Sequence, residues 1–268
     1  MAPPSPSPAR PLDDGLVSRA LEVAVRLAGD AGDVLAATAG RAAGADGGDS
    51  PFAWVRDTGA TLERHTRRVL SAEFPGIPVT GDPAPSTPYR WLVAALDGRA
   101  NYFAGLPGYA YSLALVDRTG PVVGVVADPA AGRSYAAARG RGVRTEDGPV
   151  RVSRHHGGAA GGTALAGALV CTEFADGGVP PVPGPAEFVR RATGAGAAVR
   201  VLGSAATAVT QVALGRAAAA VLPRYREPVV AGALALAVET GAVVATPGDG
   251  LLVAAPGVAG EVAAWLAT

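Results

Sequence analysis

Lysine is absent from this 268-residue chain, so its 23 basic residues are all arginines. They are balanced by 23 acidic residues, and a formal net charge of zero argues against nucleic acid or a membrane surface as the main partner. The single cysteine, Cys171, excludes an internal disulfide and suits a reducing compartment, so we expect a cytoplasmic protein. The sequence also lacks a run of about 20 apolar residues, the length that a membrane helix requires.

Small residues dominate what is present, with 37 glycines, 23 prolines and abundant alanine and valine. Together with the arginine bias, this composition favours a GC-rich, actinobacterial source. The length allows one or two domains with a large core. We expect a disordered proline-rich tail over residues 1–13, an N-terminal α+β domain over residues 14–156 and a C-terminal α/β domain over residues 163–268.

Apolar spacing predicts alternating helices and strands. Apolar residues recur at helical intervals over residues 16–38, and a second helix is expected over residues 61–74, ended by Pro75 and Gly76. Further helices are expected at residues 185–192, 205–214 and 229–240 and from Gly260 onward. Strands are expected at residues 91–96, 109–116, 122–127, 168–171, 199–202, 217–222 and 251–255.

One stretch carries a recognisable motif, because residues 91–102 read WLVAALDGRANY. It resembles the metal-site signature of the inositol monophosphatase family, W-x-x-D-P-[IL]-D-G-T-x-N-[FY]. The similarity continues along residues 15–268, with NYFAGLP at 101–107, GVVADP at 124–129, GSAA at 203–206 and AG at 231–232. The resemblance implies an α/β fold, the layered αβαβα sandwich of that family, and a homodimer.

Several of the family's functional positions hold other residues here. The metal-binding aspartates fall on Ala94 and Pro228, the signature threonine on Arg99, and the aspartate that activates water on Gly59. A two-residue slip would put Asp57 in the last position. Magnesium takes a near-octahedral shell of oxygens at about 2.1 Å, which alanine and proline side chains do not supply. We therefore expect neither a metal nor another cofactor.

The remaining polar residues near the motif define a candidate site. As catalytic residues we predict Asp97, Arg99, Tyr102 and Glu227. As substrate-binding residues we predict Asp82, Gly98, Asn101, Arg56, Asp57, Glu173 and Arg226. Arg99 is expected to hold an anionic group in place of the metals, because a guanidinium offers an oxyanion two donors at once.

Structural readings of the same residues stay open. Asp97 before Gly98 is also typical of a turn or a cap. Arg99 could be a solvated surface residue, and Glu173, just before the family's substrate loop, suits either role. His65 on a helical run is usually structural, and the adjacent His155 and His156 are a weak metal signal.

These patterns leave open three hypotheses on function. The first is a repurposed, metal-independent enzyme that performs cyclisation, dehydration, isomerisation or elimination on a small specialised metabolite. The second is a non-catalytic binder of a small anionic ligand or a partner. The third is a residual magnesium-dependent phosphatase.

Overall fold

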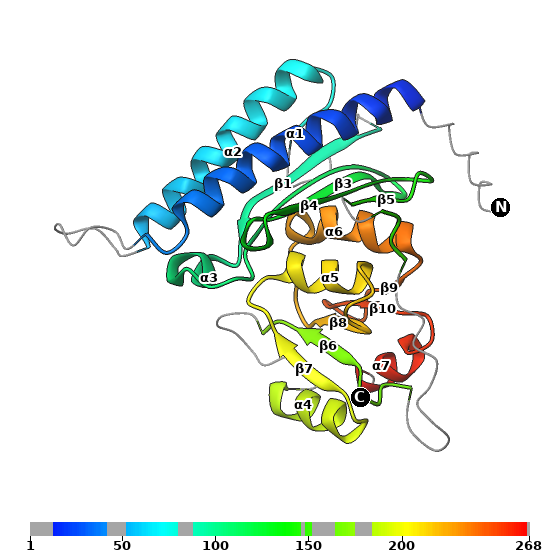
Figure 1. Cartoon of the computed structure of the whole chain (residues 1–268). Coiled ribbons are helices and arrows are strands. Elements are labelled where there is room, and N and C mark those ends of the chain that lie inside the picture. The colour runs from blue at the N-terminus through cyan, green and yellow to red at the C-terminus, as the bar shows by residue number, and fades with distance from the viewer. Residues whose placement is uncertain are drawn as a thin grey trace, which may run out of the picture.

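The computed structural model describes residues 13–41, 52–79, 88–145, 148–151, 164–174 and 184–266. Helices and sheets alternate in layers (Figure 1). Helices α1 and α2 lie outside a first sheet, α5 and α6 separate it from a second sheet, and α4 and α7 flank the far side. The predicted αβαβα sandwich is thereby confirmed, whereas the domain boundaries stay a prediction.

The first sheet is antiparallel, with strand order β1-β2-β3-β4-β5. Its strands are β1 (Arg90–Asp97), β2 (Ala110–Asp117), β3 (Gly120–Asp128), β4 (Arg133–Ala138) and β5 (Val143–Arg144). The outer helices are α1 (Asp14–Thr38) and α2 (Ala53–Glu73). The side chain of Asp13 accepts hydrogen bonds from the first turn of α1, and the apolar face predicted for this helix is buried against the sheet.

The second sheet has strand order β7-β6-β8-β10-β9, with β6 parallel to both β7 and β8. Its strands are β6 (Leu169–Thr172), β7 (Ala198–Val201), β8 (Ala219–Leu222), β9 (Val243–Ala245) and β10 (Leu251–Ala254). The other helices are α3 (Arg99–Ala104), α4 (Pro185–Gly194), α5 (Ala205–Ala213), α6 (Glu227–Thr240) and α7 (Ala259–Leu266), with a 3-10 turn at Pro129–Ala131.

Close packing places α6 on the first sheet. A Cβ at Gly124 of β3 would lie 2.4 Å from Ala235 Cβ and 2.6 Å from the carbonyl oxygen of Gly232, both on α6. Only a glycine allows strand and helix backbones to approach this closely. This contact joins the C-terminal part of the chain to the sheet that carries the signature motif.

The predicted local structure is incomplete at α2 and at strands β4, β5 and β9. Helix α2 begins at Ala53 rather than at residue 61, because Val55 packs in line with Leu62 and Leu70 although Gly59 weakens the helix between them. Strand β4 was not expected, since its alanines favour a helix; pairing with β3 overrides that propensity. Among the described residues, no helix is long and apolar enough to cross a membrane.

Candidate functional site

Asp97 stands at the end of β1, and its carboxylate reaches the start of α5. Its Oδ2 atom accepts a hydrogen bond from Ser204 Oγ at 2.7 Å and one from the backbone N–H of Ala206 at 3.0 Å. Ser204 is the N-cap of α5 and accepts in turn from the N–H of Thr207 at 3.1 Å. A carboxylate at a helix N-terminus is electrostatically favoured. Asp97 therefore links the two halves of the chain instead of serving only as a turn residue.

Glu173 approaches the same segment from the second sheet, just after β6. Its Oε1 atom accepts from the backbone N–H groups of Leu202 and Gly203 at 2.9 and 3.0 Å. Burial, the largest cause, and the nearby charge of Asp97 together raise the pKa of Glu173 to about 7, against the opposing effect of these hydrogen bonds. A carboxyl group that titrates near neutral pH is suited to give and take protons.

Asn101 on α3 is the third side chain that contacts this segment. Its Nδ2 atom donates to the carbonyl oxygens of Gly108 at 2.9 Å and Leu202 at 2.7 Å. Gly98, which precedes α3, is buried with φ +74°. A Cβ there would lie 2.2 Å from the Gly108 carbonyl oxygen, so this turn requires glycine. The fold thus gathers Asp97, Gly98, Asn101 and Glu173 around residues 202–206.

A cavity of about 400 Å³ borders this segment. Gly108 and Leu202, whose carbonyl groups bind Asn101, form part of its wall. Its charged lining residues are Asp128, Arg200 and Arg216. The volume lies in the range of small-molecule sites, and the arginines outnumber the carboxylate.

Tyr102 and Glu227 do not join Asp97. Tyr102 is fully buried, and its hydroxyl pairs with Thr38 Oγ1 at 2.7 Å, so it belongs to the core. Glu227 accepts from Arg90 Nη2 at 2.7 and 2.9 Å. Arg90 is at the opposite end of β1 from Asp97, roughly 20 Å along the strand. The arrangement of these two side chains gives no support to the catalytic roles predicted for them.

The other predicted residues are exposed or fall outside the described residues. Arg99 and Arg226 are exposed at the starts of α3 and α6. The side chains of Arg56 and Asp57 are each 73% exposed, with 3.8 Å between Arg56 Nε and Asp57 Oδ1. Asp82, His155 and His156 fall outside the described residues.

Gly59 and Asp57 are the two positions on α2 that the resemblance offers for a water-activating residue. A Cβ at Gly59 would lie 3.6 Å from Leu96 Cβ, next to the end of β1. Asp57 is two residues earlier on the same helix and therefore points about 200° away from Gly59. It lines a separate groove between α1 and α2. Asp57 therefore faces this groove and not the end of β1, where Gly59 lies.

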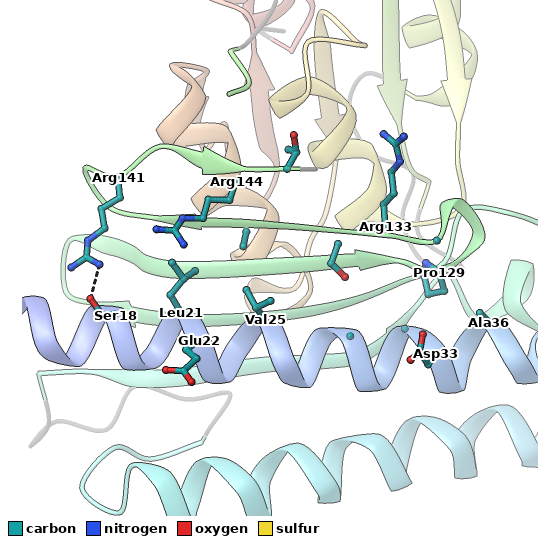
Figure 2. A pocket seen from close by; sticks show the side chains of 16 residues that line it. Ser18, Leu21, Glu22, Val25, Asp33, Ala36, Pro129, Arg133, Arg141 and Arg144 are labelled. Atoms are coloured by element: carbon teal, nitrogen blue, oxygen red, sulfur yellow. Dashed lines mark hydrogen bonds between the residues drawn. The ribbon is translucent and has the colours of Figure 1, made fainter. Parts of the chain in front are cut away.

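A further groove of about 680 Å³ separates α1 from β4 and β5 (Figure 2). In this groove Arg141 donates to Ser18 Oγ at 2.8 Å, and Glu22 and Asp33 contribute acidic side chains. None of its lining residues belongs to the cluster around residues 202–206. The groove and the cluster are therefore separate features of the surface.

Ser204 is not among the predicted site residues, although it binds Asp97 directly. The sequence does indicate a helix N-cap at Ser204, because a serine before an apolar helical run is typical of that position. Its bond to Asp97 spans 107 positions in the sequence, and spacing alone does not reveal such a contact. The backbone N–H donors of residues 202–206 could not be predicted either, because residue types do not indicate which backbone groups bind a side chain.

Comparisons with known proteins agree with the architecture. A family model described as "Inositol monophosphatase family" matches residues 16–266. The inositol-1-monophosphatase SuhB of Mycobacterium tuberculosis is 35% identical over 239 residues, which cover 81% of this chain and 79% of that protein. A histidinol-phosphatase from the same species is 38% identical over 92 residues, 35% of its length.

Solved structures show the same likeness. The structure titled "Mycobacterium tuberculosis SuhB" superimposes with a TM-score of 0.74 at 29% identity, covering 93% of this chain and 96% of that chain. The structure of inositol monophosphatase from Anabaena sp. PCC 7120 gives a TM-score of 0.77 at 22% identity, over 94% of this chain and 96% of that chain. The second likeness concerns the fold alone.

Proposed function

The chain belongs to the inositol monophosphatase family, and within that family we propose that it is a metal-independent acid–base enzyme acting on a small anionic metabolite. The observation that carries this proposal is the convergence of Asp97 and Glu173 on residues 202–206 from two different sheets. Two carboxyl groups in different surroundings supply an acid and a base without any metal.

The donor set does not fit a magnesium pair. Ala94 and Pro228 have no side-chain oxygen, and one oxygen of Asp97 is already engaged by Ser204 and Ala206. Among the described residues, no three histidine, cysteine, aspartate or glutamate side chains form a metal-binding group. A metal-pair mechanism needs both ions to clamp the attacking and leaving oxygens. We infer that phosphate-ester hydrolysis of this kind has been lost.

The chemistry that suits these groups is proton transfer. Near neutral pH Glu173 is present in both protonation states, so it can act as an acid or a base. An isomerisation would take a proton from one atom and return it to another, and a dehydration or elimination would protonate the leaving group. Neither requires an electron donor or acceptor. The choice among these reactions and cyclisation depends on the substrate.

The charge of the neighbouring cavity supports an anionic ligand. Arg200 and Arg216 line it against one carboxylate, Asp128, and guanidinium groups bind carboxylate or phosphate oxygens in pairs. Arg99 is exposed at the start of α3, on the other side of Gly98 from Asp97. Its guanidinium would hold an anionic group of the ligand over Asp97 and Gly98.

Specific observations favour the other two hypotheses as well. Both carboxyl groups already accept hydrogen bonds from at least two protein donors, an arrangement that also suits a non-catalytic binder. The relatives named inositol-1-monophosphatase favour a retained phosphatase. The decisive test must therefore separate turnover from binding and metal-dependent from metal-independent reactions.

The test is to incubate the purified protein with a metabolite extract in excess EDTA and to follow substrate loss and product gain by mass spectrometry. Asp97→Asn and Glu173→Gln are the matched variants, because each removes one ionisable group at nearly constant size. We expect a substrate–product pair with the unsubstituted protein that both variants fail to convert. Depletion of a compound without a product would identify a binder, and conversion only with added magnesium would identify a phosphatase.

We also propose a cytoplasmic homodimer. Three apolar side chains are more than half exposed against α3, just after it and at the end of β7: Phe52, Leu106 and Val201. Asn101 connects the segments of Leu106 and Val201. Its carbonyl oxygen accepts from the N–H of Leu106, and its side-chain amide donates to the carbonyl oxygen of Leu202, which follows Val201. Light scattering should give the mass of a dimer, and Leu106→Glu should give a monomer, whereas Val238→Glu, equally exposed on α6, should not.

A further inference from the structure

We propose that Asn101 is a positioning residue, which fixes the segment of residues 202–206 and thereby places the donors that face Asp97 and Glu173. It does so through its side-chain amide, not through contact with a substrate. This inference rests on the proposed function only where it assigns Asp97 and Glu173 to a reaction. We call the two hydrogen bonds from Asn101 Nδ2 to the carbonyl oxygens of Gly108 and Leu202 the clasp. The geometry of the clasp is independent of any activity.

The amide of Asn101 joins two loops that are distant in sequence. Nδ2 binds the carbonyl oxygen of Gly108, in the loop that leads to β2, and that of Leu202, in the loop that leads to α5. An amide nitrogen has two hydrogens, so both are used. Any other side chain of this size without two donors would leave at least one carbonyl oxygen unpaired.

Two glycines make room for this amide. Gly108 has φ +93° and Gly203 has φ +78°, and a Cβ would lie 2.7 Å from Nδ2 at Gly108 and 2.6 Å at Gly203. Both positions therefore require glycine for backbone conformation and for space. The amide of Asn101 therefore packs closely between Gly108 and Gly203, which distinguishes it from the amide of a surface asparagine.

The segment that Asn101 holds supplies the donors of both carboxyl groups. Leu202 and Gly203 donate through their backbone N–H groups to Glu173, and Ser204 and Ala206 donate to Asp97. A shift of Leu202 would move all these donors together, because they lie within five consecutive residues. It would also move one wall of the cavity, which Gly108 and Leu202 share.

The backbone of Asn101 has a separate, structural task. Its carbonyl oxygen accepts from the N–H groups of Gly105 and Leu106 and closes the end of α3. A side-chain substitution leaves these bonds intact. Changes in the segment of residues 202–206 can therefore be assigned to the amide.

The experiment is amide hydrogen exchange by NMR on the full chain, comparing Asn101→Ala with Thr66→Val. Thr66 Oγ1 pairs with the hydroxyl of Tyr111 at 2.9 Å, so the control also breaks a buried side-chain hydrogen bond, but away from the segment. In Asn101→Ala we expect the N–H groups of Leu202, Gly203 and Ala206 to exchange at least about tenfold faster than in Thr66→Val. Equal rates in the two variants at all three sites would overturn the proposal.

A second measurement needs no substitution. In the unsubstituted protein, the side-chain amide protons of Asn101 should exchange as slowly as the N–H of Ala206, because the clasp and the segment open together. Fast exchange of the Asn101 amide beside a protected Ala206 would contradict the proposal even if Asn101→Ala did not fold. Neither measurement depends on turnover, so a failed activity assay leaves this test unaffected.

Discussion

Replacing Glu173 by glutamine should change how stability depends on pH. The carboxyl group is half-buried beside Asp97, and its pKa is raised from about 4.5 to about 7. Below pH 4.5 the group is protonated in both folded and unfolded chains, so its titration does not change the free energy of unfolding there. Between pH 4.5 and 7 the unfolded chain loses this proton while the folded chain retains it. Folding is therefore destabilised as the pH rises, and the loss is complete above about pH 7.

The size of the effect follows from the shift. One pKa unit corresponds to about 1.4 kcal/mol, so the full shift gives about 3 kcal/mol, and solvent screening of a half-buried group lowers this to about 2 kcal/mol. Glu173→Gln removes the titration and keeps one oxygen that accepts from Leu202 and Gly203. It loses the second contact of the Gly203 N–H, with Oε2 at 3.0 Å, and this loss is the same at every pH. We compare the free energy of unfolding of the variant with that of the unsubstituted protein at each pH. The difference, variant minus unsubstituted protein, should rise by about 2 kcal/mol from pH 5 to pH 8.

Urea unfolding at half-unit pH steps measures this difference directly. Glu187→Gln is the control, because hydrogen bonds from Arg190 and Arg191 lower the pKa of Glu187 to about 2. That carboxyl group is ionised in both states above pH 6, so the control difference should be flat from pH 6 to pH 8. A Glu173→Gln difference that is equally flat would refute the raised pKa and the role of burial at this site.

Two other changes test the site and the core. The first restores four family residues together: Ala94→Asp, Pro228→Asp, Arg99→Thr and Gly59→Asp. This variant should show weak magnesium-dependent phosphatase activity, assayed by phosphate release. Single reversions should not, because the metal pair and the water activator act as a unit. Activity from Ala94→Asp alone would show that the site is less altered than we infer. Thr66→Val should lower the free energy of unfolding by about 1–3 kcal/mol, measured by urea titration, because it leaves the buried hydroxyl of Tyr111 unpaired. A loss below about 0.5 kcal/mol would mean that the Thr66–Tyr111 bond contributes little.

Much of the fold was readable from the sequence because local signals agreed with it. Residues 16–38 carry a helical apolar stripe, and the structure places α1 at Asp14–Thr38. The strand before Asp97 and the hairpin of β2 and β3 followed from apolar runs bounded by turn residues. Strand β4 did not, because an alanine-rich stretch becomes a strand only through its pairing with β3.

The candidate site was less accessible, because its contacts are long-range. Motif similarity pointed to Asp97, Asn101 and Glu173, and these side chains do lie around residues 202–206. No sequence pattern indicates that Tyr102 turns into the core or that Glu227 pairs with Arg90. Motif position specifies a place on a strand or helix, whereas the direction and partner of a side chain depend on packing.

The most direct test of the central claim is calorimetric titration of the purified protein with magnesium chloride to millimolar levels, in the presence of inositol 1-phosphate. We predict no saturable heat and no phosphate release, because Ala94 and Pro228 supply no metal ligands and Asp97 is engaged by Ser204 and Ala206. Saturable magnesium binding accompanied by metal-dependent phosphate release would contradict the account.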